Sequence, residues 1–507
     1  MTRPDRTVDG PDDWHRLSAW MIALKPIEQL PQLIPLIIAL VFAGRNMPNV
    51  AALVGIVVVP LVALLPWLTT RYQVTDEHVR LRSGVFTRTV STARRDRIRS
   101  VDLTASLPHR LLQLSTVRIG TGGDDKASTV ELSAIRTVEA DHLRELLTPG
   151  SGLIDQATGA PHEPGDGDEP RIAVAPRQPP EVLARFHTSW LRFAPFSLTG
   201  LAAVAAVVGV GFQIGNDLNL LQRGASAAEG ALRRIQEIPL PAVVAAAVAI
   251  VIVGGALVSL VGYVVGNWAF TVTRDPEDST LRVTRGLLTT FSTSLDERRI
   301  RGVHIHEPVL IRPLRGATLH AVATGSTKHP VLLPPAPADE AVRLADRVAG
   351  EAPGLTTELT RHSAGARRRR LTRGAIGGVV VIVVAAVAVV GPLTWPWLIV
   401  GAVGLVVSTG FGLVRYQHLG HALTDRSVVV ATPQVARHRY VIERSGVIGW
   451  STRQSVFQRR QGVETLVLAT AAGSEGYALI DMEPATSVAL AARVTPDLIA
   501  PFVETGV

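Results

Sequence analysis

The stretch that decides the fold is RYQVTD at residues 71–76, which leads into VRLRSGVF at 79–86. Apolar and polar residues alternate along it, and a Gly turn follows, which is the pattern of half-buried antiparallel strands. Two later stretches resemble it, namely AFTVTR at 269–274 with LRVTRGLL at 281–288, and HALTDR at 421–426 with VVV at 428–430. The chain of 507 residues therefore contains a threefold internal repeat.

The first two copies continue in step, and every copy ends in an amphipathic helical pattern. RIRSV at 97–101 matches RIRGV at 299–303, whereas the third copy keeps only the start of the motif. The helical patterns begin near Thr137, Pro337 and Ala485, and Thr137 can cap its helix. Several strands followed by one closing helix predict three small β-barrel domains, each closed by a C-terminal helix.

Two long apolar stretches precede each repeat. Crossing the roughly 30 Å hydrocarbon core of a bilayer needs about 20 apolar residues, and these stretches contain no Asp, Glu, Lys, Arg or His. They cover residues 30–42, 50–70, 194–214, 239–268, 374–392 and 395–414. The alternative is that they are buried core helices of a soluble protein. The pattern favours a multi-pass α-helical membrane protein with six spans in three pairs.

Basic residues near the predicted spans indicate orientation. The short link within the first pair holds only Arg45, whereas the run Arg367–Arg370 lies outside the third pair. Because Lys and Arg are enriched on the cytoplasmic side, both termini and the three barrels are expected in the cytoplasm. The predicted segments are 1–26 (N-terminal), 27–70 (span pair 1), 71–148 (domain 1), 149–185 (linker), 186–268 (span pair 2), 269–350 (domain 2), 351–373 (basic linker), 374–414 (span pair 3) and 415–507 (domain 3).

Four features together resemble a known bacterial family. A span pair, Tyr-x-Val-Thr-Asp, an Arg-x-Gly turn and an Arg-Ile-x-x-Val strand resemble the bacterial membrane-flanked pleckstrin-homology-like (PH-like) domain. Three copies in one chain are similar to the YdbT-like family of bacterial membrane proteins. The resemblance implies a PH-like barrel, no enzymatic activity, a bacterial cell-membrane location and a smaller single-domain membrane protein of the same class as a partner. It implies no particular ligand.

Catalytic patterns are missing from the sequence. The chain has no cysteine, which excludes disulfides, thiolate nucleophiles and Cys-based metal sites. It contains no GxSxG or HExxH motif, and the glycine-rich GTGGDDK at 120–126 lacks the ending of a phosphate loop. The nearest approach to metal ligands is His304, His306, Glu307 and His320, interpreted as surface or partly buried residues. We therefore predict no enzyme, no cofactor and no metal.

Arginines gather in each repeat, within a chain of formal net charge +8. Such a charge suits nucleic acid or a membrane surface, but we find no recognition helix or set of stacking aromatics for nucleic acid. The predicted headgroup or partner contacts are Arg94, Arg95, Arg97 and Arg99 in repeat 1, Arg298, Arg299 and Arg301 in repeat 2, and Arg437 and Arg439 in repeat 3. The run Arg367, Arg368, Arg369 and Arg370 is a predicted membrane-surface anchor. The alternative is the general enrichment of arginine in cytoplasmic loops.

These features predict a non-enzymatic integral membrane scaffold. Its PH-like domains would bind membrane lipid headgroups or a partner membrane protein, with envelope integrity as the expected setting. The alternative is a component of a transporter or exporter, for which the spans supply few polar groups beyond residues such as Ser259. Gly262 and Gly266 are four apart, which favours close helix packing within the chain or in a homo-oligomer.

Overall fold

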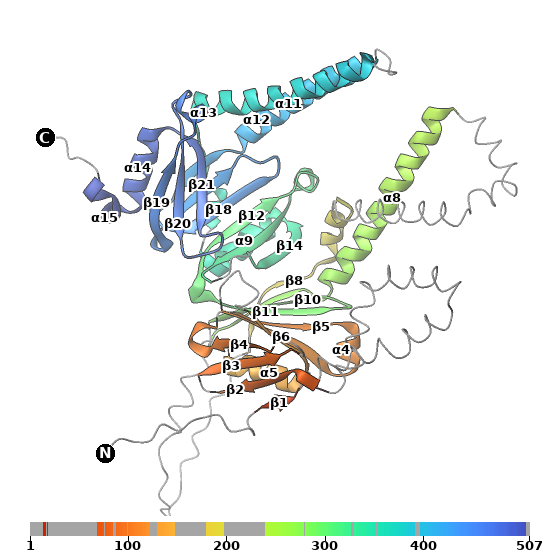
Figure 1. Cartoon of the computed structure of the whole chain (residues 1–507), viewed down its shortest axis with the longest axis vertical. Coiled ribbons are helices and arrows are strands. Elements are labelled where there is room, and N and C mark those ends of the chain that lie inside the picture. The colour runs from red at the N-terminus through yellow and green to blue at the C-terminus, as the bar shows by residue number, and fades with distance from the viewer. Residues whose placement is uncertain are drawn as a thin grey trace, which may run out of the picture. The chain divides into compact units, whose positions relative to one another are not determined.

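The chain divides into two compact units, each built on β-sheets (Figure 1). Unit 1 comprises Met1–Arg185, Ala269–Arg299 and Gly325–Thr327, and unit 2 comprises Phe186–Trp268, Ile300–Thr324 and Lys328–Val507. The structure is a computed structural model, which describes residues 14–16, 18, 68–75, 77–84, 88–98, 100–121, 129–147, 179–196, 239–277, 279–325, 329–350, 352–390 and 396–502.

Unit 1 contains the first repeat and the opening strands of the second. Its sheets have the strand orders β1-β2-β3-β4 and β7-β6-β5-β11-β10-β9-β8. The strands are β1 (His15–Arg16), β2 (Arg71–Val74), β3 (His78–Ser83), β4 (Thr89–Arg94), β5 (Ser100–Ala105), β6 (Leu114–Gly120), β7 (Thr129–Arg136), β8 (Glu181–Arg185), β9 (Thr271–Asp275), β10 (Thr280–Arg285) and β11 (Thr290–Asp296). The helical segments are η3 (Arg95–Arg97), α4 (Leu107–Leu111), α5 (Thr137–Leu147) and η8 (Glu297–Arg299).

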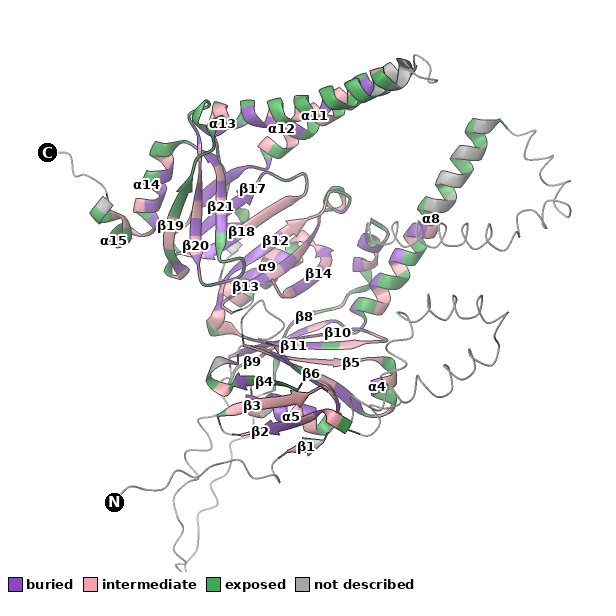
Figure 2. Cartoon of the chain, in the orientation of Figure 1, coloured by how far each residue is buried: buried purple, intermediate pink, exposed green. Residues whose placement is uncertain are grey.

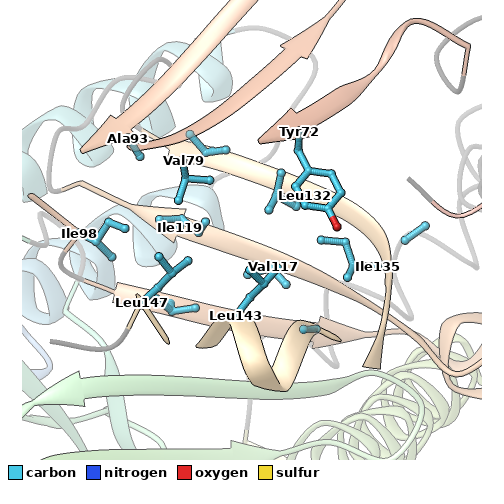
Figure 3. Packing of buried hydrophobic residues seen from close by; sticks show 14 of the residues in the cluster. Tyr72, Val79, Ala93, Ile98, Val117, Ile119, Leu132, Ile135, Leu143 and Leu147 are labelled. Atoms are coloured by element: carbon cyan, nitrogen blue, oxygen red, sulfur yellow. The ribbon is translucent and has the colours of Figure 1, made fainter. Parts of the chain in front are cut away.

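Alternating strand residues of repeat 1 form the core of unit 1 (Figure 3). Val79, Val117 and Leu132 are fully buried, and Leu143 and Leu147 of α5 pack onto the same cluster. Removing each of these large apolar side chains from water stabilises the fold by about 1.5–3 kcal/mol. The helix therefore closes the barrel of repeat 1, as its amphipathic pattern predicts.

Unit 2 contains the rest of repeat 2 and all of repeat 3. Its sheets have the orders β14-β13-β12-β18-β17-β16-β15 and β19-β20-β21. The strands are β12 (Ile300–Glu307), β13 (Gly316–Ala323), β14 (Val331–Pro337), β15 (Thr360–Arg361), β16 (Gly420–Leu423), β17 (Ser427–Thr432), β18 (Arg437–Glu443), β19 (Val447–Arg453), β20 (Glu464–Thr470) and β21 (Gly476–Met482). The helical segments are η7 (Thr188–Phe196), α8 (Leu240–Asn267), η9 (Arg312–Leu314), α9 (Ala338–Ala349), α10 (Ala352–Thr356), α11 (Ala364–Val390), α12 (Pro396–Gln417), η10 (Arg444–Gly446), α13 (Val456–Arg459), α14 (Pro484–Val494), α15 (Pro496–Ile499) and η11 (Ala500–Phe502).

Successive repeats are joined by strand pairing. Each repeat supplies three strands, a single turn of 3-10 helix, three more strands and a closing helix, which is α5, α9 or α14. In the first seam, β5 of repeat 1 pairs with β11 of repeat 2, and in the second seam, β12 of repeat 2 pairs with β18 of repeat 3. Each seven-stranded sheet therefore consists mainly of strands from two repeats, joined by antiparallel main-chain hydrogen bonds.

The prediction of a six-span, multi-pass helical membrane protein is wrong. Within the described part of the chain, one helix, Ile399–Gln417, is long and apolar enough to cross a membrane, and four β-sheets dominate the architecture. Of the other predicted spans, residues 30–42, nearly all of 50–70 and most of 194–214 lie outside the described residues.

The apolar stretch at 239–268 contributes in part to protein packing. It forms α8, but Ser259, Tyr263 and Asn267 near its end are buried. The Tyr263 hydroxyl donates a hydrogen bond to the carbonyl oxygen of Pro335 at 2.6 Å, and Ser259 donates to that of Ala194. An apolar run long enough to span a bilayer therefore packs at one end on the protein, which hydropathy alone cannot distinguish from lipid contact.

Helices α11 and α12 form an antiparallel hairpin with exposed apolar sides (Figure 2). Small residues bring the two backbones together, because a Cβ on Gly378 would meet Leu405 and one on Gly412 would meet the Arg370 carbonyl. α11 begins at Ala364, ten residues before the predicted span start at 374, so its first turns carry the basic run. Residues such as Val384 and Val406 are exposed on the outside of the hairpin.

The basic end of α11 is fixed to repeat 3 by a buried carboxylate. Asp481 is fully buried and forms ion pairs with Arg369 and, at 2.8 Å, with Arg370. The Gln458 side-chain amide donates a third hydrogen bond to it at 3.0 Å. Buried charges need such partners, because a lone one carries a large desolvation cost.

We predict that Asp481→Asn destabilises the fold by about 3–5 kcal/mol, because two buried guanidinium groups lose their counter-ion. Thermal unfolding of the purified full-length chain measures the effect. The matched control is Asp96→Asn, which removes the exposed partner of Arg94 and should cost at most about 1 kcal/mol. Equal losses in the two variants would contradict this account.

Candidate functional site

The predicted contact arginines of repeat 1 lie around the 3-10 turn η3. Arg94 is exposed and pairs with Asp96 at 2.9 Å. Arg95 donates a hydrogen bond to the carbonyl oxygen of Leu146 at 2.7 Å, which ties η3 to the end of α5. The Arg97 side chain and Arg99 lie outside the described residues.

The predicted arginines of repeats 2 and 3 have partners within their own units. Arg298 and Arg299 lie 3.4 and 3.6 Å from the Asp296 carboxylate. The other three pairings are Arg301 with Glu443 at 3.2 Å, Arg437 with Glu307 at 3.4 Å, and Arg439 with the carbonyl oxygens of Leu355 and Thr357. Burial also lowers the pKa of Arg439. Contact of these side chains with lipid or a partner stays a prediction.

The predicted membrane-surface anchor divides into two pairs. Arg367 and Arg368 are exposed, whereas Arg369 and Arg370 are buried against Asp481. Contact with a membrane surface therefore stays a prediction for Arg367 and Arg368, and the other two have a structural role inside unit 2.

A cavity of about 1280 Å³ in unit 1 is lined by strands of the first seam, α4 and α5. Its cations are balanced locally: Arg144 lies 3.1 Å from Asp141, and Arg136 lies 3.7 Å from Glu139. The paired charges make it a poor site for an anion.

Five histidines gather on one side of the second seam in unit 2, and we call them the histidine cluster: His304, His306, His320, His329 and His438. His304 is central and buried, with its ring stacked 4.1 Å from that of Tyr440, centroid to centroid. Its Nε2 lies 3.1 Å from Nδ1 of His438, and the rings of His306 and His438 stack at 4.2 Å.

Strand register explains how the histidine cluster forms. His304 is opposite His320 on β13 and opposite Tyr440 on β18, and His306 is opposite His438. The sequence indicated His304, His306 and His320 but not His438 or His329. His304 and His306 alternate along one strand, which puts both side chains on one face. This alternation was the signal for those two residues. Identifying His438 needed the pairing partner of β12, which lies in the next repeat.

Burial lowers the pKa of four members of the histidine cluster, His304, His306, His329 and His438. Burial, followed by repulsion from the other four histidines, lowers the pKa of His304 to about 2. Burial and repulsion from His438 and His320 lower the pKa of His306 to about 4. Neutral imidazoles offer one donor and one acceptor each. Within the described residues no group of three or more His, Cys, Asp or Glu side chains could hold a metal ion.

A second cavity, of about 770 Å³, adjoins the histidine cluster in unit 2, and we call it the α8 cavity. Its walls come from η7, α8, and the strands and connection of β12 and β13. Most lining side chains are apolar: Phe193, Phe196, Val258, Tyr263, Val309, Leu310 and Ile311. The polar groups include His306, Thr318, His320 and Asn267. Such a cavity, mainly apolar with a few polar groups, has the form of a small-molecule site.

Each repeat has two sets of three antiparallel strands and a closing helix. Three such repeats in series define a tandem of PH-like domains. The family model described as bacterial PH domain matches residues 28–150, 199–352 and 375–494, so the chain belongs to this family. No curated protein and no solved structure matches the chain. The matches confirm the internal repeat and are consistent with a scaffold that binds lipid or protein.

We predict that acid destabilises unit 2 through His304. Its folded-state pKa lies below the unfolded value near 6.5, so the unfolded chain binds the proton first. Stability is then complete above pH 6.5 and falls as the pH drops, by about 1.4 kcal/mol per pH unit for a fully shifted group.

The measurement is the unfolding temperature of the full-length chain at pH 7 and pH 5. His304→Phe should reduce the difference between the two pH values, because the group can no longer take up a proton on unfolding. His187→Phe, at an exposed position in unit 2, is the control. A difference unchanged by His304→Phe would refute the role of this histidine.

Proposed function

We propose that this chain is a non-enzymatic, membrane-associated scaffold whose bacterial PH domains bind an amphiphilic lipid. The observation that carries the proposal is the α8 cavity, in which apolar side chains and two histidines, His306 and His320, line the same space. Its volume of about 770 Å³ suits part of a lipid molecule.

Exposed apolar residues line the α8 cavity or are next in sequence to its lining residues. Leu257 and Val261 on α8 are 58% and 61% exposed, and Val309 and Leu310 on the β12–β13 connection are 47% and 42% exposed. Contiguous exposed apolar surface next to a pocket marks a ligand or membrane contact. An acyl chain that extends from the cavity along α8 would cover this surface.

The polar side chains of the lining can receive a headgroup. His306 and His320 reach the cavity from β12 and β13, together with the hydroxyl of Thr318. Because burial lowers the pKa of His306 to about 4, this neutral imidazole would recognise headgroup oxygens by hydrogen bonds rather than by charge. Arg437 does not supply a free positive charge for the headgroup, because it already pairs with Glu307.

Helix α12 supports a position at the membrane. It ends at Gln417, and β16 begins at Gly420, so the two residues between them hold repeat 3 within roughly 10 Å of the helix end. The exposed Arg367 and Arg368 lie at this same end of the hairpin, because Gly412 packs against Arg370. The potential of an anionic leaflet extends over a similar distance. We propose a bacterial cell membrane, with the PH domains and both termini on its cytoplasmic face.

We also propose that the chain is a member of the YdbT-like family. The first repeat supports it through the RYQVTD and RIRSV motifs. A smaller single-domain PH-like membrane protein would then be a partner, and envelope integrity the setting of the scaffold.

We predict that Gly262→Leu blocks lipid binding in the α8 cavity. Gly262 lines the cavity, and a side chain added there meets open space, so the leucine fills the cavity without disturbing the helix. Gly266→Leu is the matched control, since it also meets open space but does not line the cavity. Native mass spectrometry of the purified full-length chain measures retained lipid. We expect its loss in the first variant alone; equal retention in both would rule out the cavity.

We predict that Val406→Arg weakens membrane association. Val406 is 72% exposed on α12, and an arginine near the centre of a helix in hydrocarbon costs about 2.5–3.5 kcal/mol. The fraction of the protein that stays with bacterial membranes after an alkaline wash should fall. Val488→Arg, on the exposed face of α14, is the control and should stay with the wild type. An unchanged membrane fraction for both would remove α12 as the anchor.

A further inference from the structure

The two seams pair equivalent residues in the same register. Val101 is opposite Ser294 in the first seam, and Val303 is opposite Val441 in the second. Val101 and Val303 hold the same position after the 3-10 turns η3 and η8, and Ser294 and Val441 hold the same position before η8 and η10. The seam is therefore a repeated interface, in which the strand after one turn accepts the strand before the next turn.

This repeated interface leaves one edge open at each end of the tandem. β4 in repeat 1 corresponds to β11 and β18, and among the described residues it pairs only with β3. β19 in repeat 3 corresponds to β5 and β12, and in the same part of the chain it pairs only with β20. Among the described residues, β4 is thus a strand of the docking (donor) kind without a partner on its edge, and β19 is a strand of the receiving (acceptor) kind without one.

Glycine occupies the same position on β12, the acceptor strand of the second seam, and on β19. In the second seam, a Cβ on Gly302 would collide with the carbonyl oxygen of Val441, so only glycine allows β18 to approach. Gly449 holds the equivalent position on β19, just past the same bulge. A Cβ on Gly449 meets nothing within 4 Å. The space that β18 fills at Gly302 is open at Gly449.

Both free edges lack the usual protection against strand addition. Natural edges carry Pro, Lys or inward charges that prevent pairing. Neither β4 nor β19 contains Pro or Lys, and their only charged residues, Arg94 and Arg453, are the last residue of each strand. Val90 and Ile448 are 55% and 63% exposed on them.

We propose that a second copy of this chain docks its β4 on β19, continuing the series of seams from one molecule to the next. By the shared register, Ser91 of one copy is opposite Ser451 of the other, and Thr92 is opposite Trp450. The contact is heterologous, so each copy keeps one free edge of each kind, and assembly produces a ring or a filament.

Cysteine cross-linking of the full-length chain in membranes tests the register, because the chain has no native cysteine. Ser91→Cys and Ser451→Cys protein are mixed and oxidised. Directly opposed residues lie about 4.5–5.5 Å apart, within disulfide reach, so we expect a disulfide-linked dimer. Thr92→Cys mixed with Ser451→Cys is the control, since a one-residue shift turns the side chain to the other face.

Gly449→Val tests the interface without an added cross-link. The added side chain meets open space in the single chain, so the unfolding temperature should not change, whereas docking of β4 is blocked. We expect the assemblies of the wild-type chain in detergent, sized by light scattering, to become monomers. Any one of three results would overturn the proposal. These are a monomeric wild-type protein, equal cross-linking by the Thr92→Cys control, and unchanged assembly of Gly449→Val.

Discussion

The structure depends on main-chain hydrogen bonding between repeats. A three-stranded half-barrel has an exposed strand at its edge, and this edge must be paired or covered. The chain solves this by pairing β5 with β11 and β12 with β18. The pairing requires little of the side chains apart from close approach, which explains why Gly302 is needed where β18 crosses the bulge. Each repeat is thereby stabilised by its neighbour, as in other repeat proteins.

The second seam also creates the chemistry of unit 2. Pairing β12 with β18 brings His304 and His306 beside His438 and Tyr440, although the two strands belong to different repeats. Burial, and then repulsion from neighbouring imidazoles, lowers the pKa of His304 and His306. His306 and His320 also line the α8 cavity, so this cavity lies beside the joint between two repeats.

Local features of the fold could be predicted from the sequence, and nonlocal ones could not. The alternation in RYQVTD and its later counterparts predicted strands, and α5 begins at Thr137 as its helical pattern indicated. The partners of β5 and β12 lie far along the chain, so no short-range pattern encoded either seam. The partners of the predicted contact arginines could not be identified for a related reason. Residues such as Arg301 and Arg439 find partners in distant segments, Glu443 and Leu355, which the sequence does not identify.

The apolar stretches show how one composition can serve two environments. Hydropathy measures the cost of exposing a segment to water, and burial against protein relieves this cost as well as lipid does. For part of α8, packing on protein removes this cost. The Tyr263 and Ser259 hydroxyls there donate hydrogen bonds to backbone carbonyl groups of the same unit. The α11–α12 hairpin has no such cover over residues such as Val384 and Val406 among the described elements. At its basic end, Arg369 and Arg370 form buried ion pairs with Asp481, and Arg415 and Tyr416 donate hydrogen bonds to the carbonyl oxygens of Pro433 and His362. These contacts fix the basic end of the apolar hairpin to the rest of unit 2.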